Sequence, residues 1–515
     1  MTEDAAVPGG VQPSQRRIYA GALILIVLLS AYLRFEELGV RSLWHDELCT
    51  WRVSRMDVGE SLRWGPELTK PPLYQFALRV LTRDPRPSEA RLRLPAAICG
   101  VLTVLVGWWL GRLGGGWPVG LGVAGLLACN GLQVYYSQEA RPYAMLVLGC
   151  ALSTVLWYRL VLAPGRLYFY AYIVAAVLTL HAHYLAVLTV VGHFVWWLIM
   201  LSRRPMDRRT FRPLAALVVT GILCIGIVAR YFCFRSSAFQ GLNWIEPPTW
   251  HNTLDVLEKL TFGRHWILAL LIPAFALWIA GACGLSLKRL WRPGGPLFAG
   301  AEDLCGLLLL CFLGGWFGLL VTSWLAHPAM VARYALPAAV PALLFPLIVA
   351  FRLDRRAPVI LMLVFVIGTA PAWVNREFGP GLRELAMYLE EYVDPEREAV
   401  VVIMDATIQP GWEDSGRLGF QYYPMENVPI EELLLNPDGL TARNSILEDP
   451  RGLYLVMLWA DPFPVLEAAG RQALPIVHEG RSYSQLLFTP YRLVRVAPIP
   501  FNEGKRERSS FFGSR

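Results

Sequence analysis

Two acidic residues, Asp46 and Glu47, stand side by side just after the first strongly apolar stretch of the chain. A carboxylate is costly to place near a bilayer, so ionisable residues in such positions tend to have a function. Acidic residues in a loop also cap helices or simply face water, and the residue types alone leave both interpretations open. Trp44 and Trp51 flank the pair, as suits a loop at a membrane interface, although tryptophan is also an ordinary anchor there.

Other charged side chains lie in comparable positions. Lys70 precedes Pro71 and Pro72. A cation on such a stiff turn would stabilise an anion such as a phosphate, or would extend to the interface as a snorkelling lysine. Arg333 is suited either to bidentate binding of phosphate or to interfacial anchoring. Glu139 and Arg141 need partners next to a bilayer, and pairing with each other or with other spans is the simpler account.

A metal site receives little support. His181 and His183 are two residues apart, a spacing that does not place both rings on one helical face, and no acidic residue is near them in sequence. The nine cysteines form no Cys-x-x-Cys pair, and we interpret them as small buried hydrophobic residues. We therefore predict no metal ligands and no certain cofactor, although the sequence leaves a divalent metal ion open.

The composition is that of a membrane protein. Of the 515 residues, 55% are hydrophobic and only 17% are charged, whereas soluble domains carry about 25% charged residues. The net charge of +7 falls mostly in short loops between apolar segments, where it orients a protein in the bilayer. We expect contact with membrane lipids and no nucleic-acid partner.

Apolar stretches of about 20 residues predict about eleven transmembrane helices. The first apolar run continues to about Leu33 with no cleavage site after it, and we expect it to be a retained signal anchor. We divide the long apolar stretch 168–201 at His181–Tyr184, and Pro72–Leu81 suits a short helix within a loop. The predicted spans are 18–35, 92–111, 118–136, 143–163, 168–182, 184–201, 214–234, 266–284, 304–325, 331–350 and 357–374.

The charges test this topology independently. If the N-terminus with Arg16 and Arg17 is cytoplasmic, every inward loop carries arginine or lysine, as the positive-inside rule requires. The same count places all the polar clusters on the opposite, outer face. The sequence therefore predicts an inner-membrane protein with one working face, the outer one.

After about Trp373 the composition changes to that of a soluble domain. Helix-like Leu382–Val393 precedes strand-like Val400–Met404, and further strand candidates are Leu453–Trp459 and Leu486–Val496. We predict a polytopic α-helical membrane protein with a C-terminal exported α/β domain, periplasmic or extracellular. The predicted parts are a cytoplasmic tail (1–17), a transmembrane domain (18–374) with its first outer loop at 36–91, the exported domain (375–503) and a basic tail (504–515).

Five motifs in this order resemble the glycosyltransferase C superfamily, in particular its dolichyl-phosphate-mannose protein mannosyltransferases and the bacterial lipid A aminoarabinose transferase. The resemblance covers about residues 18–350, and no motif of it reaches the final domain. The motifs are Asp46-Glu47, Pro71-Pro-Leu-Tyr74, Arg93-Leu-Pro-Ala-Ala-Ile-Cys-Gly100, Tyr136-Ser-Gln-Glu-Ala-Arg-Pro-Tyr143 and Arg333-Tyr-Ala-Leu-Pro337.

The resemblance implies transfer of a sugar from a polyprenyl-phosphate donor to an acceptor on the outer face, with inversion at the anomeric carbon. Asp46 would be the catalytic base, Glu47 its supporting neighbour and Glu139 a second acidic residue of the site. Lys70, Arg141 and Arg333 would hold the donor phosphate. Many relatives have histidine before the Pro-Pro pair, and a lysine there is more like the aminoarabinose transferase. We further expect substrate contacts from Trp44, His45, Tyr74, Tyr143, His183 and Tyr334.

Two other classes of function stay open. A transporter or flippase would also use ionic and aromatic groups, but would place charges or broken helices near the middle of the membrane. A non-catalytic envelope assembly subunit would depend on the final domain rather than on Asp46. Within the superfamily, the acceptor could be a lipid, a glycan or a protein, and the sequence does not separate these.

Overall fold

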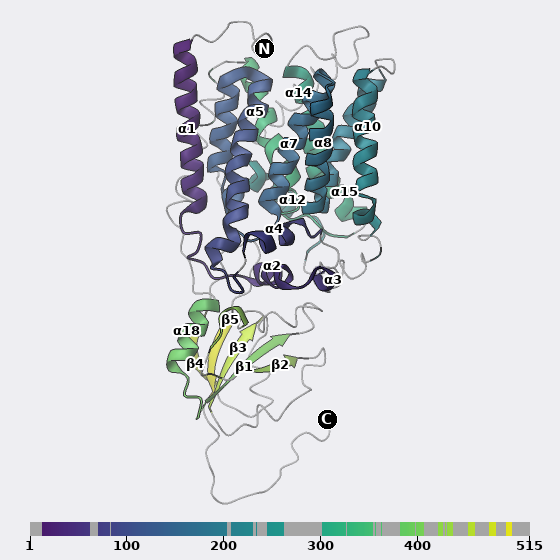
Figure 1. Ribbon diagram of the computed structural model, residues 1–515. Helices are drawn as coiled ribbons and strands as arrows, with labels where there is room; N and C mark the ends of the chain where they lie inside the picture. The colour runs from purple at the N-terminus through teal and green to yellow at the C-terminus, as the bar shows by residue number, and fades with distance from the viewer. Residues whose placement is uncertain are drawn as a thin grey trace, which may run out of the picture. The chain divides into compact units, whose positions relative to one another are not determined.

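The protein is described by a computed structural model (Figure 1). The described residues are 13–61, 71–82, 84–202, 208–229, 233, 245–261, 301–325, 327–353, 356, 362, 382–396, 398–405, 421–425, 428, 430–435, 452–458, 473–479 and 491–496. The chain forms two compact units. The helical unit comprises Met1–Arg41 and Cys49–Arg376, and the second unit comprises Ser42–Leu48 with Glu377–Arg515.

The helical unit is a bundle of apolar helices with short helices gathered at one end (Figure 1). Its first half contains α1 (Pro13–Phe35), α2 (His45–Arg55), α3 (Val58–Ser61), α4 (Leu73–Leu81), α5 (Glu89–Cys129), α6 (Gly131–Ser137), α7 (Tyr143–Leu162) and α8 (Arg166–Ala182). Its second half contains η2 (Tyr184–Ala186), α9 (Val187–Leu201), α10 (Arg208–Leu223), α12 (Trp250–Thr261), α14 (Ala301–Phe312), η3 (Leu313–Phe317), α15 (Gly318–Leu325), η4 (Leu336–Ala338) and α16 (Ala339–Leu353). Helix α2 begins in the second unit and continues into the helical unit at Cys49.

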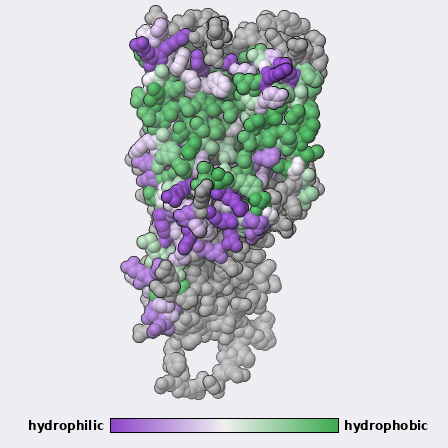
Figure 2. Space-filling view, viewed as in Figure 1, coloured by the Kyte–Doolittle hydropathy of each residue, from purple (hydrophilic) through white to green (hydrophobic). Residues whose placement is uncertain are grey.

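Five helical segments among the described residues are long and apolar enough to cross a membrane, and the protein is a multi-pass membrane protein. Three shorter apolar helices accompany them. Figure 2 shows a broad band of hydrophobic residues across the helical unit, with hydrophilic residues at both ends of the helices. The predicted count of eleven spans stays a prediction, because the span at 266–284 and almost all of that at 357–374 lie outside the described residues. The five segments are Pro13–Phe35, Glu89–Cys129, Tyr143–Leu162, Tyr184–Leu201 and Leu304–Leu325.

Helix α5 is a hairpin of two helical arms rather than one straight helix. The backbone leaves helical geometry at Gly115 and Gly116, and Gly116 has a φ of 73°, which glycine adopts without strain. The arms then run side by side, since a Cβ atom on Gly111 would lie 3.0 Å from the Cα of Gly120. The hairpin corresponds to the predicted spans 92–111 and 118–136.

The second arm ends earlier than predicted. It stops at Cys129, and Asn130 starts α6 as its N-cap, with its side-chain oxygen accepting a hydrogen bond from the backbone N–H of Gln133 at 3.0 Å. An asparagine in this role satisfies an otherwise unpaired N–H group and favours a new helix start. The predicted division near His183 is confirmed. Residue His183 is extended (φ −159°, ψ 128°) between α8 and η2, and its Nδ1 accepts from the N–H of Leu185.

The described part of the second unit contains α18 (Leu382–Tyr392) and a five-stranded sheet. The strands are β1 (Glu398–Asp405), β2 (Ile430–Leu435), β3 (Gly452–Leu458), β4 (Ala473–Glu479) and β5 (Tyr491–Val496), in the order β2-β1-β3-β5-β4. Strand β1 pairs in parallel with β2 and β3, and β5 pairs antiparallel with β3 and β4. Strands β1, β3 and β5 overlap the three stretches expected to be strands. The sequence reading did not name β2 or β4.

Candidate functional site

The acidic pair lies in the first turn of α2. His45 is the first residue of this helix and Trp44 directly precedes it. A carboxylate oxygen of Glu47 accepts a hydrogen bond from the backbone N–H of Trp44 at 3.3 Å, which is half of a capping box. Glu47 is fully buried, whereas Asp46 is half-buried. Glu47 therefore caps the helix, as the residue types allowed. This hydrogen bond holds the first turn of α2, which contains Asp46.

The segment before α2 is held within the second unit. The backbone N–H of Leu43 donates to the phenolic oxygen of Tyr423 at 2.8 Å, and both residues are buried. The two residues are 380 positions apart in the chain. No local pattern in the sequence indicated Tyr423.

Arg141 binds the same helix one turn further on. It lies in the turn between α6 and α7, and its Nη1 donates to the hydroxyl oxygen of Thr50 at 2.7 Å. Both residues are buried, with Arg141 only 1% exposed. Thr50 follows Asp46 by four positions, which places the two on the same face of α2. The turn that contains Glu139 and Arg141 is thus attached to the helix that begins with the acidic pair.

A chain of aromatic rings continues from Arg141. Its guanidinium carbon lies 6.0 Å from the ring centre of Tyr143, the first residue of α7. The Tyr143 ring lies 5.0 Å from that of Tyr136 and 5.6 Å from that of His183. His183 in turn lies 4.8 Å from Tyr184. Two of the predicted substrate-binding residues, Tyr143 and His183, are therefore neighbours.

Glu139 and Arg333 both act electrostatically on the phenol of Tyr136. Burial raises the pKa of the Tyr136 phenol well above its usual value, the nearby Glu139 carboxylate raises that pKa further, and the Arg333 guanidinium lowers it. Both charges must lie close to act in this way. Arg333 is 8% exposed, and its guanidinium carbon lies 5.4 Å from the ring centre of Tyr334. The structure thus brings the late Arg-Tyr pair to the same end of the bundle as the α6–α7 turn.

The predicted site residues also include Tyr74 and Lys70. Tyr74 lies in α4 and is completely buried. Lys70 lies outside the described residues. Its phosphate-binding role stays a prediction.

Two buried side chains, Arg34 and Gln138, attach the end of α1 to the end of α5 and to the residue that follows α6. Arg34, near the end of α1, donates to the carbonyl oxygens of Leu127 (2.9 Å) and Ala128 (3.0 Å) in the last turn of α5. Gln138 donates to the carbonyl oxygens of Leu33 (3.1 Å) and Glu36 (3.0 Å) at the end of α1. Each side chain satisfies carbonyl groups that a helix end leaves unpaired.

Arg93 ties the entrance of the first loop to α5. It donates to the carbonyl oxygens of Leu38 (3.0 Å) and Arg41 (2.8 Å) and is buried. Arg41 in turn donates to the carbonyl oxygen of Gln138 at 3.1 Å. This network fixes the start of the loop that leads to α2 against the turn that leads to Glu139.

Gly100 allows the close packing that this arrangement requires. A Cβ atom there would collide with the Ser137 side chain and lie 2.7 Å from Nε of Arg34. In the motif from Arg93 to Gly100, Arg93 thus anchors the start of the first loop, and Gly100 allows the side chains of Arg34 and Ser137 to pack closely against α5. Sequence reasoning quoted this motif without a role for either residue, and it missed Thr50 and Gln138, because a lone threonine or glutamine in such a segment carries no distinctive pattern.

The described residues include no group of three or more histidine, cysteine, aspartate or glutamate side chains that would hold a metal ion. The Nδ1 of His181 lies 2.8 Å from the carbonyl oxygen of Val177 within α8. The Nδ1 of His183 instead faces the Leu185 N–H. These contacts use one nitrogen of each ring within the local fold.

The sequence matches no protein-family model and no curated protein. Among solved structures, the chain resembles ArnT from Cupriavidus metallidurans in the apo state, with 14% sequence identity, a TM-score of 0.48 and coverage of 93% of this chain and 98% of ArnT. It also resembles the Archaeoglobus fulgidus oligosaccharyltransferase tethered to an acceptor peptide. The identity there is 10%, the TM-score is 0.50, and 92% of this chain and 75% of the other are covered.

This chain shares the fold of that oligosaccharyltransferase, whose fold is that of the glycosyltransferase C superfamily. The likeness extends over most of the chain, which is more than the motifs alone covered. The fold expected from the five motifs is therefore confirmed. At such low identity the likeness concerns the fold alone, so the activity must be argued from the site.

Proposed function

We propose that this protein is a membrane glycosyltransferase that moves a sugar from a polyprenyl-phosphate donor to an acceptor. The acceptor is a lipid, a glycan or a protein. One observation carries the proposal. Arg141 binds Thr50, 91 positions away in the chain, at 2.7 Å on α2, the helix whose first turn contains Asp46, so a residue of the Tyr136–Tyr143 motif is attached to the helix that begins with the acidic pair.

The chemistry suits these residue types. The acceptor hydroxyl must lose its proton as it attacks the anomeric carbon, and a single carboxylate base performs that step. We assign it to Asp46, which is half-buried and therefore more accessible than fully buried Glu47. The reaction passes through an oxocarbenium-like state, and direct displacement inverts the anomeric centre.

The leaving group is a lipid phosphate, which needs neutralisation of its charge more than a proton. Arg141 and Arg333 supply guanidinium groups suited to phosphate. Their burial keeps water away and strengthens their interaction with an anion. Lys70 completes this proposed set. Glu139, which acts on the same tyrosine as Arg333, is the second carboxylate of the site.

Trp44, His45, Tyr74, Tyr143, His183 and Tyr334 are the proposed substrate contacts. Of these, Tyr143 and His183 form part of the aromatic chain beside Arg141. Their flat, partly polar rings suit contact with a sugar or with the start of a lipid chain.

The proposed orientation places this end of the bundle at the outer face of the inner membrane. The N-terminus is then cytoplasmic, and the final α/β domain is exported. The arginine and lysine residues of the opposite loops support this orientation.

A transporter would use polar groups near the middle of its spans. The polar side chain in the middle of α9 is His193, which is fully buried. Its Nε2 lies 3.2 Å from the Thr154 hydroxyl and its Nδ1 lies 3.1 Å from the Tyr172 hydroxyl, while its ring stacks on Trp157. The two ring nitrogens of His193 thus connect α9 to α7 and α8. This contact has a packing role, so it gives no support to an ion pathway through the bundle at this position.

The proposal is tested by sugar transfer in membranes that contain a radiolabelled pool of polyprenyl-phosphate sugars. Wild-type protein and Asp46→Ala are compared at equal insertion. We expect a labelled product with the wild type only, and its chemical nature identifies the acceptor. Equal labelling with both proteins, or none with either across several donors, would overturn the proposal.

A further inference from the structure

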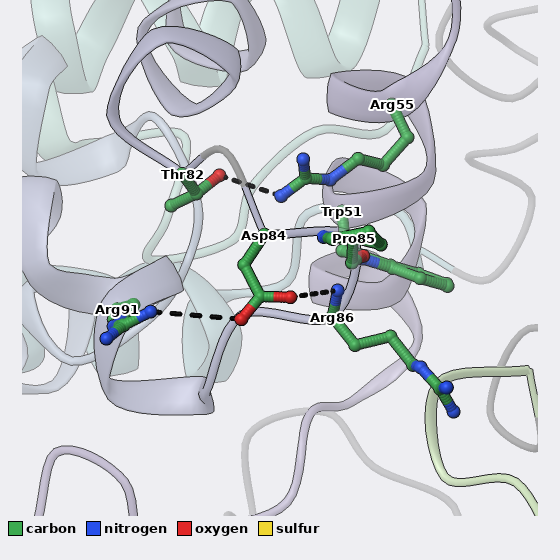
Figure 3. Close-up of polar contacts among 7 residues, drawn as sticks. All are labelled: Trp51, Arg55, Thr82, Asp84, Pro85, Arg86 and Arg91. Atoms are coloured by element: carbon green, nitrogen blue, oxygen red, sulfur yellow. Dashed lines mark hydrogen bonds and ion pairs between the residues drawn. The ribbon is translucent and has the colours of Figure 1, made fainter.

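A short connection between α4 and α5 holds the second half of α2. We call Thr82 and residues 84–91 the strap. The indole Nε1 of Trp51 donates to the carbonyl oxygen of Pro85 at 3.0 Å, and Nη2 of Arg55 donates to the hydroxyl of Thr82 at 3.0 Å (Figure 3). Trp51 and Arg55 are four positions apart, so they project from one face of α2. This face meets the strap at two points.

The strap is itself fixed at both ends. The Thr82 hydroxyl donates to the carbonyl oxygen of Leu78 in α4 at 2.7 Å. Asp84 accepts from the backbone N–H of Arg86 at 3.1 Å and forms an ion pair with Arg91 of α5 at 3.8 Å (Figure 3). Pro85 and Pro87 restrict the backbone between these points. The exposed ion pair contributes little by itself, so the stiffness rests on the prolines and on Thr82.

A third hydrogen bond holds the end of α2, and it comes from α4. Arg79 donates from its guanidinium to the carbonyl oxygen of Met56, the residue that follows α2. The contacted residues at the end of α2 and just after it are also well packed, since Trp51 and Met56 are 7% and 6% exposed. The second half of α2 is therefore fixed by two elements that contain none of the proposed catalytic carboxylates.

We propose that the strap positions Asp46 for catalysis by fixing the axis of α2, with Trp51 and Arg55 as positioning residues. This inference rests on the proposed function. Asp46 lies five residues before Trp51, or about 7.5 Å along the helix. A swing of roughly 10° about Trp51 would displace Asp46 by about 1.3 Å, and a misplacement of about 1 Å can slow a reaction about 100-fold.

The first test is Trp51→Phe, which removes the indole donor and keeps an aromatic ring. Trp108→Phe is its matched control, because Nε1 of Trp108 is buried and has no hydrogen-bond partner among the described residues. We expect hydrogen exchange of the α2 amides to rise at least about tenfold in Trp51→Phe, with α7 unchanged. We expect Trp108→Phe to leave α2 unchanged.

The second test is the kinetics of sugar transfer. A positioning role predicts that kcat falls by about 10- to 100-fold in Trp51→Phe while the KM for the donor stays within about twofold. Arg55→Met should lower kcat in the same way, and Arg55→Lys, which keeps a cationic donor for Thr82, should restore most of it.

The outcomes separate the two proposals. Unchanged exchange in α2 overturns the inference, and so does raised exchange with unchanged kcat. A wild type that transfers no sugar overturns the proposed function and with it the catalytic consequence of the strap. The exchange experiment then decides alone whether the strap holds α2.

Discussion

Arg141 Nη1 lies 2.7 Å from Thr50 Oγ1, and this contact attaches the turn between α6 and α7 to helix α2. The two residues are 91 positions apart, and both are buried. Every proposed role of Asp46 depends on where α2 lies. The contact is therefore one of those that fix the position of the helix that carries Asp46.

Thr50→Val tests this contact. Valine has nearly the shape of threonine but lacks the hydroxyl, so it removes one acceptor from a buried guanidinium. We expect a loss of stability of about 1–3 kcal/mol, the usual cost of leaving a buried polar group unsatisfied. Thermal unfolding in detergent measures it. Thr322→Val is the control, because Thr322 is exposed and its hydroxyl donates to the carbonyl oxygen of Gly318 within its own helix turn. Equal stability of the two variants would contradict the role of the contact.

Glu47 can be tested as a helix cap separately from any role in catalysis. Glutamine at this position retains an oxygen for the Trp44 N–H, whereas alanine does not. We expect Glu47→Ala to destabilise the first turn of α2 by about 0.5–2 kcal/mol and Glu47→Gln to do so much less. Hydrogen exchange of the first α2 amides measures the difference. If both variants behave alike, the cap is not what holds this turn.

The π-helical turn η3 controls the approach of η4, which follows Arg333 and Tyr334. A Cβ atom on Gly315 would lie 2.8 Å from both the Cβ and the backbone nitrogen of Ala338. We expect Gly315→Ala to destabilise the protein by about 1–3 kcal/mol through overpacking. A Cβ atom on Gly221 in α10 meets nothing within 4 Å among the described residues, so Gly221→Ala should be neutral or slightly stabilising. Thermal unfolding measures the stability of both variants. An unchanged stability of Gly315→Ala would contradict the prediction, because it would mean that η4 moves away from the added methyl group without cost.

The multi-pass helical part of the fold could be predicted from the sequence because membrane spans are strong local signals. The division near His183 was visible as a polar interruption in a long apolar run. The end of the second α5 arm was wrong by several residues, because Asn130 is a cap in a stretch that otherwise reads as apolar helix. Apolar character sets the presence of a span, while a single capping side chain sets its end.

The contacts of the proposed site could be anticipated from the sequence only in part, for a different physical reason. Asp46, Glu139, Arg141 and Arg333 have charges that stand out near a bilayer. Thr50 and Tyr423 have no such signal, since each acts through one hydrogen bond to a residue far away in sequence. Such pairs depend on tertiary packing and leave no periodicity.

The most direct test of the central claim is the rate of sugar transfer by Asp46→Asn at equal insertion. Asparagine keeps the size of the side chain and removes its ability to take a proton. Asp57→Asn is the matched control in the same loop, because Asp57 is exposed and caps α3 through the Glu60 N–H at 2.9 Å. We predict that kcat falls at least about 100-fold in Asp46→Asn and stays within about twofold in Asp57→Asn. Full transfer activity in Asp46→Asn would contradict the assignment of Asp46 as the base.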